Sequence, residues 1–474
     1  MTKVLISGNF NVLHPGHIRL FKLAKEVGNE LVVAISSERN NSNKLSVPLE
    51  LRIESLRSIE MVDEVRVIET TIEELLLEIK PDYVLKGREH ENSANPEAVV
   101  IESYGGSLIF GSGDFTLSSS EYMETINHEK HFAESVGREF LTRHKIESSK
   151  LRELISKIGT LNVLVIGDLI IDEYISCESV GLSQEDPSVI FRPLETQKFV
   201  GGAGIVGLHA RSLGAMTTYV SVLGEDLESD FARTHLESGG VNFIELSDGL
   251  RKTVLKQRFR ARGKTHFRIN HFDDGLISNK TRSKLISICK DEIDKCDLVI
   301  FSDFNYGVLD SHSASELISH ASKKGVFIAA DCQISSQIAD YTKYKGVDLL
   351  TPTEHECRVT LRNNIDGLAA IAIDFQRTMN CRNLLLTLGA DGVLMQDTTF
   401  ETNLITDLLP ALSNASSDVA GAGDSFLVLA SMTLALGGTL AEAAFLGSIA
   451  AAIQVNRVGN TPLKLVEILE SLQK

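Results

Sequence analysis

The sequence is poor in features that would place it in a membrane or outside the cell. It has no tryptophan, only six cysteines and no long uninterrupted apolar run. A membrane helix needs roughly 20 consecutive apolar residues, so we expect no membrane span. The N-terminal residues MTKVLISGNF lack the apolar core and cleavage site of a signal peptide, and they read instead as a first buried strand. No Cys-x-x-Cys pair occurs, so we expect reduced thiols, no zinc and a cytoplasmic location.

Positive charge is also scarce, since the formal net charge is −17. Such an acidic chain is a poor partner for nucleic acid, whose backbone carries a dense negative charge. Any phosphate would have to be held locally by helix N-termini, loop amides, a few basic side chains and a metal ion. Local phosphate-binding patterns are therefore the informative features of this sequence.

Apolar runs alternate with helix-periodic segments over most of the chain, which predicts parallel sheets covered by helices on both faces. In the first part we expect strands at 3–7, 30–36, 65–68, 83–86 and 107–110, and helices at 16–27, 49–60, 72–80 and 96–103. The length of 474 residues exceeds one ordinary core, so two or three domains are expected.

The domain boundaries follow from a change in pattern. We expect a first domain over residues 1–127, a charged helical linker over 128–158, and a second α/β domain over 159–474. The linker pattern is also compatible with a helix that packs on either neighbour. In the second domain we expect strands at 161–167, 218–223, 298–302, 326–331, 349–351 and 384–387, and a helix or helix pair at 439–455. Residues 252–270 alternate with period two, which predicts a small separate sheet, such as a lid.

The first chemical motif is GNFNVLHPGH, which follows the first predicted strand and opens a helix. Gly8 permits an unusual backbone at the strand end. His14 and His17 lie three residues apart at the positive end of the helix dipole, where both could donate to phosphate oxygens. The alternative is that both histidines only cap and pack the helix. We favour catalysis because the motif directly follows a first strand, where a nucleotide's phosphates would sit.

This motif resembles the HxGH signature of the nucleotidyltransferase superfamily that includes the cytidylyltransferases, over residues 1–127. The resemblance implies catalytic roles for His14, His17 and Lys44, and it matches Arg52 to an arginine of the family. It also implies that the nucleotide is bound by Gly8, Phe10, Lys86, Gly87, Ser118, Ser119 and Ser120. Two positions depart from the family pattern, because Asn11 stands for an aspartate and Thr125 for an arginine. The departure at Asn11 is compatible with lower efficiency or with a changed substrate.

The second motif is DVAGAGDSF, at 418–426, which precedes a long apolar helix. Its small residues let backbone amides approach an anion at the helix start, and Asp424 would lie in the first turn, within reach of a sugar hydroxyl. Phosphoryl transfer needs a base, donors for the phosphoryl oxygens and a metal, and this motif supplies the first two. A tight glycine-rich turn into a core helix is the structural alternative.

Together with GGAG, GDLIIDEY and TLGADG, this motif resembles the ribokinase-like (PfkB) carbohydrate kinases over about residues 160–470. The resemblance implies a Mg-ATP site, with Asp424 as the general base and with Gly421, Ala422 and Gly423 as the anion hole. It places Thr387 and Gly389 along the nucleotide and Glu356 near the magnesium ion. The implied sugar-binding residues are Asp168, Asp172, Gly201, Gly202, Lys256, Arg258 and Arg268.

One subfamily is more similar still, the heptose 7-phosphate kinases of ADP-heptose synthesis, through SDFNYGVL and TPTEHE. Kinase and adenylyltransferase are often fused in that pathway, usually with the kinase first, whereas this chain has the reverse order. Ile205 stands where the family has a substrate-binding asparagine, so the sugar pocket is expected to differ, and Thr353 stands for an asparagine of the metal region, where Glu356 is kept. Alternation places six basic lid residues on one face, where they could meet a substrate phosphate: Lys256, Arg258, Arg260, Arg262, Lys264 and Arg268. A solvated strand face is equally compatible with this pattern.

The leading prediction is a bifunctional sugar-activating enzyme of two doubly wound α/β domains. It would phosphorylate a sugar phosphate with ATP and Mg²⁺, and transfer a nucleotide to a sugar 1-phosphate with release of pyrophosphate. Heptose 7-phosphate and ADP-heptose are the expected substrate and product, and a homodimer is the expected assembly. The alternatives are the same chemistry on another sugar or with CTP, or a degenerate sensor that binds nucleotide or sugar without turnover.

Overall fold

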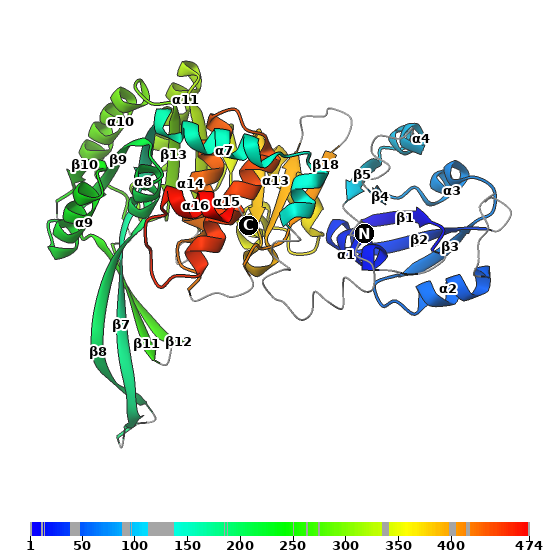
Figure 1. Cartoon of the computed structure of the whole chain (residues 1–474), viewed down its shortest axis with the longest axis horizontal. Coiled ribbons are helices and arrows are strands. Elements are labelled where there is room, and N and C mark those ends of the chain that lie inside the picture. The colour runs from blue at the N-terminus through cyan, green and yellow to red at the C-terminus, as the bar shows by residue number, and fades with distance from the viewer. Residues whose placement is uncertain are drawn as a thin grey trace.

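The computed structural model describes residues 2–10, 13, 15–37, 48–87, 95, 97–111, 137–183, 185–186, 188–249, 251–261, 264–273, 275–333, 341–397, 404–413 and 418–472. The description below concerns those residues. They form an N-terminal unit, which ends at residue 111, a C-terminal unit, which begins at residue 137, and a lid that extends from the C-terminal unit (Figure 1).

The N-terminal unit is a five-stranded parallel sheet in the order β5-β4-β1-β2-β3. Its strands are β1 Lys3–Gly8, β2 Glu30–Ser36, β3 Glu64–Ile68, β4 Tyr83–Gly87 and β5 Ser107–Gly111. Its helices are α1 Pro15–Val27, α2 Leu49–Arg57, α3 Ile72–Ile79 and α4 Glu97–Ser103. Apolar side chains line both faces of the sheet and pack under these helices, as the continuous apolar runs of a parallel sheet require.

The C-terminal unit is built on a second parallel series, in the order β10-β9-β6-β13-β14-β15-β16-β17-β18. These strands are β6 Asn162–Gly167, β9 Met216–Leu223, β10 Asn242–Ser247, β13 Leu298–Asp303, β14 Phe327–Cys332, β15 Leu349–Leu350, β16 Asn383–Thr387, β17 Val393–Asp397 and β18 Leu404–Leu409. Only β17 runs antiparallel to its neighbours among the described strands of this series.

Helices cover both faces of this series, and the core lies between them and the sheet. The helices are α7 Ser148–Lys157, α8 Ala203–Ser212, α9 Leu227–Ser238, α10 Asn279–Ile293, α11 Ser311–Lys324, α12 Glu354–Leu361, α13 Leu368–Met379, α14 Ala422–Ala435, α15 Leu440–Val455 and α16 Leu465–Ser471. Short 3-10 turns occur at η3 Ile158–Thr160, η4 Tyr341–Tyr344 and η5 Gly389–Asp391.

The lid is a separate four-stranded sheet in the order β12-β11-β7-β8. It consists of β7 Leu169–Leu182, β8 Val189–Gly202, β11 Val254–Ala261 and β12 Lys264–His271. The sequence predicted a small sheet from the last two strands alone. The two 14-residue strands β7 and β8, which form the long hairpin of Figure 1, were not predicted.

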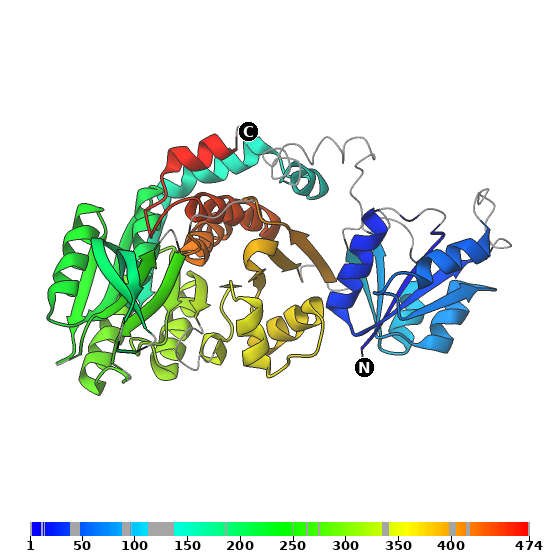
Figure 2. The same ribbon diagram turned by 90° about the horizontal axis from the view of Figure 1, so that it is seen from below.

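The two units share one sheet, which the sequence did not predict. Strand β18 pairs in parallel with β5, with Leu404 opposite Ile109 and Ile405 opposite Phe110. The joined sheet has 14 strands, and the carboxyl ends of all its strands except β17 lie along the same edge. Helix α1 also packs against α13, as the blue and yellow helices of Figure 2 show. Ala369 of α13 is fully buried in the core of the N-terminal unit.

The predicted linker, residues 128–158, packs on the C-terminal unit wherever it is described. A helix at 137–143 places Phe140 in the large core, and α7 adds Leu151 and Ile155 to the same core. The His144 ring lies 2.7 Å from the Asp407 carboxylate of β18. Of the two interpretations of this segment, the described part favours a helix packed on its C-terminal neighbour.

The described helices are all too short or too polar to cross a lipid bilayer.

Candidate functional sites

The first candidate site lies where β1 ends and α1 begins. Phe10 adopts a left-handed backbone (φ 44°) and is buried, and its ring lies 5.0 Å from that of His17. Gly8 lies against this ring, since a methyl group built there would be 3.0 Å from it. The strand end therefore folds over the start of α1 and holds His17 at the carboxyl edge of the sheet, where the sequence predicted it.

The side chain of Arg52 holds the loop between β1 and α1 through a backbone carbonyl of that loop. It is 1% exposed, and its Nη1 donates to the carbonyls of Asn9, at 2.8 Å, and Ser36, at 3.2 Å. One guanidinium from α2 thus ties the motif loop to the end of β2. The sequence matched Arg52 to a family position, and the contacts show that it holds the backbone of the motif.

Lys86 and Gly87 lie at the carboxyl end of β4, as predicted. The Lys86 ammonium forms an ion pair with the buried Glu97 of α4 and donates to Asn95 Oδ1 at 3.0 Å. The other predicted residues of this site lie outside the described residues: His14, Lys44, Ser118, Ser119 and Ser120. The two departures from the family pattern, Asn11 and Thr125, also lie outside them.

The second candidate site is centred on the start of α14. Gly421 is its N-cap in a left-handed conformation (φ 74°), and Ala422 and Gly423 form the first turn. A methyl group built on Gly423 would meet no atom within 4 Å, so the space in front of this turn is open. The free amides of a helix start favour an anion at this point.

Asp424 follows in the same turn. Burial raises the pKa of its carboxyl to about 7, repulsion from Asp172 adds to the shift, and Lys256 opposes it. A carboxyl group with a pKa near neutrality can accept a proton and release it again. The geometry therefore places a titratable acid beside an anion-binding helix start.

Asp172, on β7, faces Asp424 from the lid side and is 4% exposed. Its Oδ1 accepts a hydrogen bond from Arg258 at 3.1 Å, and its Oδ2 accepts one from Asn460 at 3.0 Å. Gly201 leaves room for this carboxylate, since a methyl group there would be 2.3 Å from Oδ2. Gly202, with φ 58°, turns the chain from β8 into α8.

The basic residues of the lid divide between two environments. Lys256, Arg258 and Arg260 alternate along β11 and point inward, with Lys256 over the rings of Phe304 and Tyr306, at 5.4 and 5.3 Å. The guanidinium groups of Arg258 and Arg260 lie over the Tyr174 ring, at 5.2 and 5.3 Å. Lys264 and Arg268, on β12, are exposed, so the six basic lid residues predicted to share one face do not all meet at one site. Arg262 lies outside the described residues.

Asp168 is placed differently from Asp172. It is 2% exposed, and its carboxylate accepts backbone hydrogen bonds from Phe304 at 2.9 Å, Tyr306 at 3.2 Å and Val308 at 3.2 Å. Burial and the neighbouring Asp303 raise the pKa of Asp168 to about 6, against these three hydrogen bonds. In this structure Asp168 shapes the 303–309 loop, which carries the two rings under Lys256. The sugar contact predicted for it stays a prediction.

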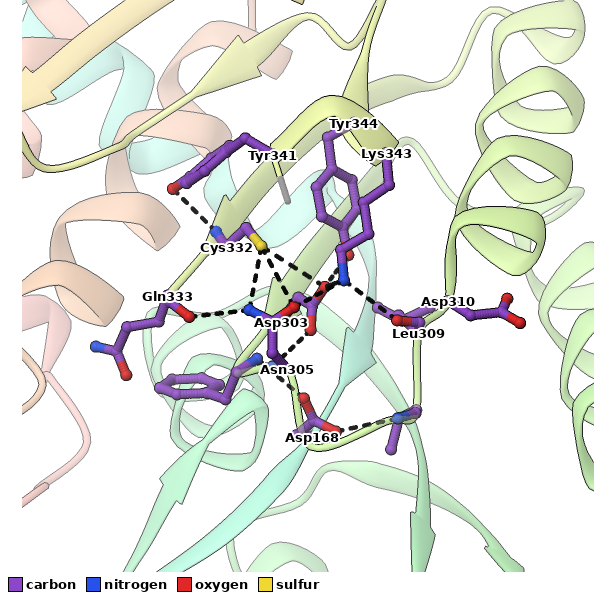
Figure 3. A network of polar contacts seen from close by, with 12 residues as sticks. Asp168, Asp303, Asn305, Leu309, Asp310, Cys332, Gln333, Tyr341, Lys343 and Tyr344 are labelled. Atoms are coloured by element: carbon purple, nitrogen blue, oxygen red, sulfur yellow. Dashed lines mark hydrogen bonds and ion pairs between the residues drawn. The ribbon is translucent and has the colours of Figure 1, made fainter. Parts of the chain in front are cut away.

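A buried ion pair holds the same loop from the other side (Figure 3). Lys343 of η4 pairs with Asp303 and donates to Asn305 Oδ1 at 3.0 Å and to the Leu309 carbonyl at 3.2 Å. The Tyr344 hydroxyl donates to Asp303 at 2.6 Å. The sequence did not single out Lys343, because nothing in the local pattern shows that η4 lies under this loop.

The predicted nucleotide residues lie at the end of β16. Thr387 donates from its backbone amide to the Pro352 carbonyl at 2.8 Å, and Gly389 takes a left-handed conformation (φ 61°) in open space. Thr353 and Glu356 form a reciprocal capping box at the start of α12, at 3.3 and 2.7 Å. The threonine that departs from the family pattern therefore has a local structural role.

Asp331 lies at the end of β14, near Glu356. Burial, with repulsion from Glu356, raises its pKa well above the usual range, and the charge of Asp424 adds to this shift. Among the described residues, no group of three or more histidine, cysteine or acidic side chains forms a metal-binding cluster. Ile205, the other departure, is fully buried in the core of the C-terminal unit.

This geometry defines a class of protein. A glycine-rich helix start and the titratable Asp424 beside it supply the oxygen donors and the base that phosphoryl transfer requires, and they lie at the edge of a parallel α/β sheet under a small β lid. The chain belongs to the pfkB family of carbohydrate kinases, whose family model matches residues 160–465. Residues 5–154 match the cytidylyltransferase-like family, so the two matches occur in the order that the sequence predicted.

Curated relatives are named as bifunctional proteins. The chain is 30% identical over 335 residues to the bifunctional protein HldE of Trichlorobacter lovleyi, covering 69% of this chain and 66% of that protein. It is 33% identical over 313 residues to the bifunctional protein HldE of Helicobacter acinonychis, covering 65% of each. The matches thus span just under two thirds of these relatives.

Solved structures confirm the fold of the C-terminal unit. Phosphofructokinase-2 from Escherichia coli, in complex with potassium, superimposes with a TM-score of 0.55 at 14% identity, covering 66% of this chain and 100% of that one. Ribokinase from Arabidopsis thaliana, complexed with ribose and ATP, gives a TM-score of 0.53 at 15% identity, covering 66% and 99%.

Proposed function

We propose that the C-terminal unit phosphorylates a sugar phosphate with ATP, and that heptose 7-phosphate is phosphorylated at its anomeric hydroxyl. The observation that carries this proposal is Asp424, with its pKa of about 7, in the first turn of α14. As general base it would take the proton of the attacking hydroxyl. The amides around Gly421, Ala422 and Gly423 would stabilise the charge on the transferred phosphoryl group.

The sugar would lie between Asp424 and the lid. Asp172 would accept sugar hydroxyls, and Lys256 would bring a positive charge to the acidic side of the site. Gly201 supports this placement because its missing side chain leaves room for the Asp172 carboxylate. The substrate's own phosphate would meet the basic residues of β11, and Arg268 is the candidate at the outer edge.

Magnesium would enter with ATP. Mg²⁺ prefers oxygen ligands and often uses only one or two carboxylates together with substrate phosphates. Asp331 and the buried Glu356 fit this requirement, because a cation would relieve the repulsion from Glu356 that, after burial, raises the pKa of Asp331. Bound magnesium would neutralise charge on the phosphates, while Thr387 and Gly389 would lie along the nucleotide.

We propose that the N-terminal unit transfers a nucleotide to a sugar 1-phosphate, giving an NDP-sugar, ADP-heptose for the expected substrate, and pyrophosphate. His17 at the start of α1 supports this, together with the Arg52 clamp on the same loop. His14 and Lys44 would complete the hold on the triphosphate, with Ser118–Ser120 on the nucleotide phosphates. The attacking group would be the phosphate of the sugar.

The test uses the full chain with both substrates. ADP formation from ATP and heptose 7-phosphate, and pyrophosphate release from ATP and heptose 1-phosphate, are expected. Asp424→Asn should abolish only the first activity, and His17→Ala only the second. If neither activity appears across a panel of sugar phosphates, with ATP or CTP, the proposed function is wrong.

A second candidate keeps the chemistry and changes the sugar or the nucleotide. Ile205 favours it, because a fully buried isoleucine offers no donor to a substrate. Comparing kcat/KM for heptose 7-phosphate with that for other sugar phosphates, and ATP with CTP, decides between the two. A sensor would instead bind these ligands in calorimetry without turnover.

We propose further that the chain is a homodimer and works in the reducing cytoplasm. Support for the dimer comes from exposed apolar side chains on the lid, among them Leu182, Leu194 and Phe267. Support for the compartment comes from the six cysteines, all of which are free. Light scattering of the intact chain, compared with a Leu182→Lys/Leu194→Lys variant, tests the dimer.

A further inference from the structure

Asn460 lies between two parts of the kinase site that come from distant segments. It follows α15, is 7% exposed, and its Nδ2 donates to Asp172 Oδ2 at 3.0 Å. On its other side, a methyl group built on Gly421 would be 2.4 Å from Asn460 Oδ1. The side chain therefore fills the space between the carboxylate that faces the sugar and the first residue of the anion-binding turn.

Asn460 is itself fixed to that turn through the backbone. The neighbouring amide of Gly459 donates to Asp418 Oδ2 at 3.2 Å. Gln454 donates to the carbonyls of Gly459, at 2.9 Å, and Ala420, at 3.2 Å. The loop that carries Asn460 thus cannot shift without moving residues 418–421.

The two oxygens of Asp172 are held from opposite directions. Arg258, on the lid strand β11, donates to Oδ1 at 3.1 Å, whereas Asn460, on the body, donates to Oδ2. Arg258 and Asp172 belong to the same lid sheet, so Arg258 cannot by itself relate Asp172 to α14. Asn460 can, because it contacts both. Among the described residues, Asn460 Oδ1 has no hydrogen-bond partner, which is a costly arrangement for a buried amide.

We propose that Asn460 is a positioning residue of the kinase, which holds the Asp172 carboxylate at a fixed place relative to Gly421 and Asp424. The inference rests on the sugar kinase activity proposed above. Asn460 would act through Asp172 and through the turn, and would not have to touch the reacting atoms. Asp172 is close enough to Asp424 to raise the pKa of its carboxyl, so the placement of Asp172 also affects the base.

The sharpest test is Asn460→Asp, which keeps the shape of the side chain. While the introduced carboxyl is protonated it can still donate to Asp172, whereas once ionised it cannot donate and repels that carboxylate. The ionisable groups around this pair are Arg258 and Tyr174 from the lid, Asp418 from the glycine-rich turn, and Asp424 from α14, beside which Lys256 lies. We expect kcat/KM for heptose 7-phosphate to fall about tenfold or more at pH 8, as for loss of a charge-assisted hydrogen bond. The ratio of variant to wild type should rise as the pH falls toward 6.

A second variant and a matched control separate positioning from stability. Asn460→Leu removes the donor at all pH values, so its ratio to wild type should be low and should change less with pH than that of Asn460→Asp. Gln376→Leu is the control, because Gln376 is also a buried amide whose oxygen has no partner among the described residues, but it lies on α13. It should lose stability and keep the wild-type KM for the sugar and the wild-type pH profile.

The outcomes are distinguishable. If wild type phosphorylates no sugar phosphate in the panel, the proposed function fails. If wild type is active and the pH profile of Asn460→Asp is parallel to that of wild type, the positioning role of Asn460 is wrong. Should Asn460→Leu not fold, the pH-dependent ratio of Asn460→Asp still decides, because a purely structural role would lower both ends of the profile alike.

Discussion

The Tyr174 hydroxyl donates a 2.6 Å hydrogen bond to the carboxylate of Asp418, although the two residues are 244 positions apart in the sequence. Tyr174 belongs to the lid, and its ring carries Arg258 and Arg260 on its face. Asp418 begins the glycine-rich turn and accepts the backbone amides of Ala420 and Gly459, each at 3.2 Å. This contact joins the lid to the turn that would bind the phosphoryl group.

Removing the hydroxyl should loosen this joint. Burial alone would raise the pKa of Asp418, but its hydrogen bonds, the first from Tyr174, keep that pKa below the usual value. Tyr174→Phe removes one donor from a half-buried carboxylate, so we expect a loss of about 1–2 kcal/mol in stability and a kcat about tenfold lower. Steady-state kinetics and thermal unfolding measure both effects.

Tyr219→Phe is the control for that substitution. Tyr219 is a fully buried tyrosine whose hydroxyl lies 3.4 Å from the Gly167 carbonyl, away from the turn. It should alter stability while leaving kcat close to wild type. An equal fall of kcat in both variants would show that the Tyr174–Asp418 contact has no special part in turnover.

Asp424 predicts two pH effects of opposite direction. As a base it must be ionised, so kinase kcat/KM should fall below an apparent pKa near 7. For folding, a raised pKa means that the folded state holds the protonated carboxyl more easily than the ionised one. The protein is therefore more stable while Asp424 is protonated. This contribution is fully present below the unfolded pKa of about 4 and is lost as the pH rises through about 7.

Asp424→Asn should therefore be inactive as a kinase yet more stable than wild type at pH 8. Asparagine avoids the free-energy cost of an ionised carboxyl in this site. We expect the melting temperature to be higher by roughly 2–4 °C for each kcal/mol of that cost. The difference should shrink toward pH 4. Melting curves across this range check the sign, and a variant less stable than wild type at pH 8 would contradict it.

The sequence predicted most of the parallel strands because their apolar runs are short, regular and bounded by turns. Both candidate sites could be proposed from the sequence because the spacing of the glycines in each motif reports on backbone shape. Asn460 and Lys343 could not be found in this way, since each acts through contacts with residues far away in the sequence. Strands β7 and β8 escaped because burial is confined to the first part of β7 and the last residues of β8, so neither strand shows a regular apolar alternation along its length. The β18–β5 pairing involves two residue pairs at an edge, which no local pattern reveals.

Arg52 leads to a prediction for the N-terminal unit alone. Arg52→Met leaves the Asn9 and Ser36 carbonyls without this donor, which should cost about 1.5–3 kcal/mol and distort the loop that holds His17. Pyrophosphate release should fall strongly while sugar phosphorylation is kept. Arg57→Met, on the exposed end of the same helix, is the control and should change neither activity. Equal activities in both variants would show that the clamp is dispensable.

Gly367 tests whether the two units behave as one body. It is the N-cap of α13, and its α-carbon lies so close to the end of α1 that an added methyl group would be 1.7 Å from the Glu26 carbonyl oxygen. The obstacle is backbone and cannot rotate away, so Gly367→Ala should separate α1 from α13 and expose Ala369. We expect a larger radius of gyration in small-angle scattering and two resolved unfolding transitions. Gly275→Ala, where a methyl group would meet no atom within 4 Å, should preserve the wild-type profile. If both variants scatter alike, the contact between α1 and α13 does not hold the units together, and the β18–β5 pairing must do so alone.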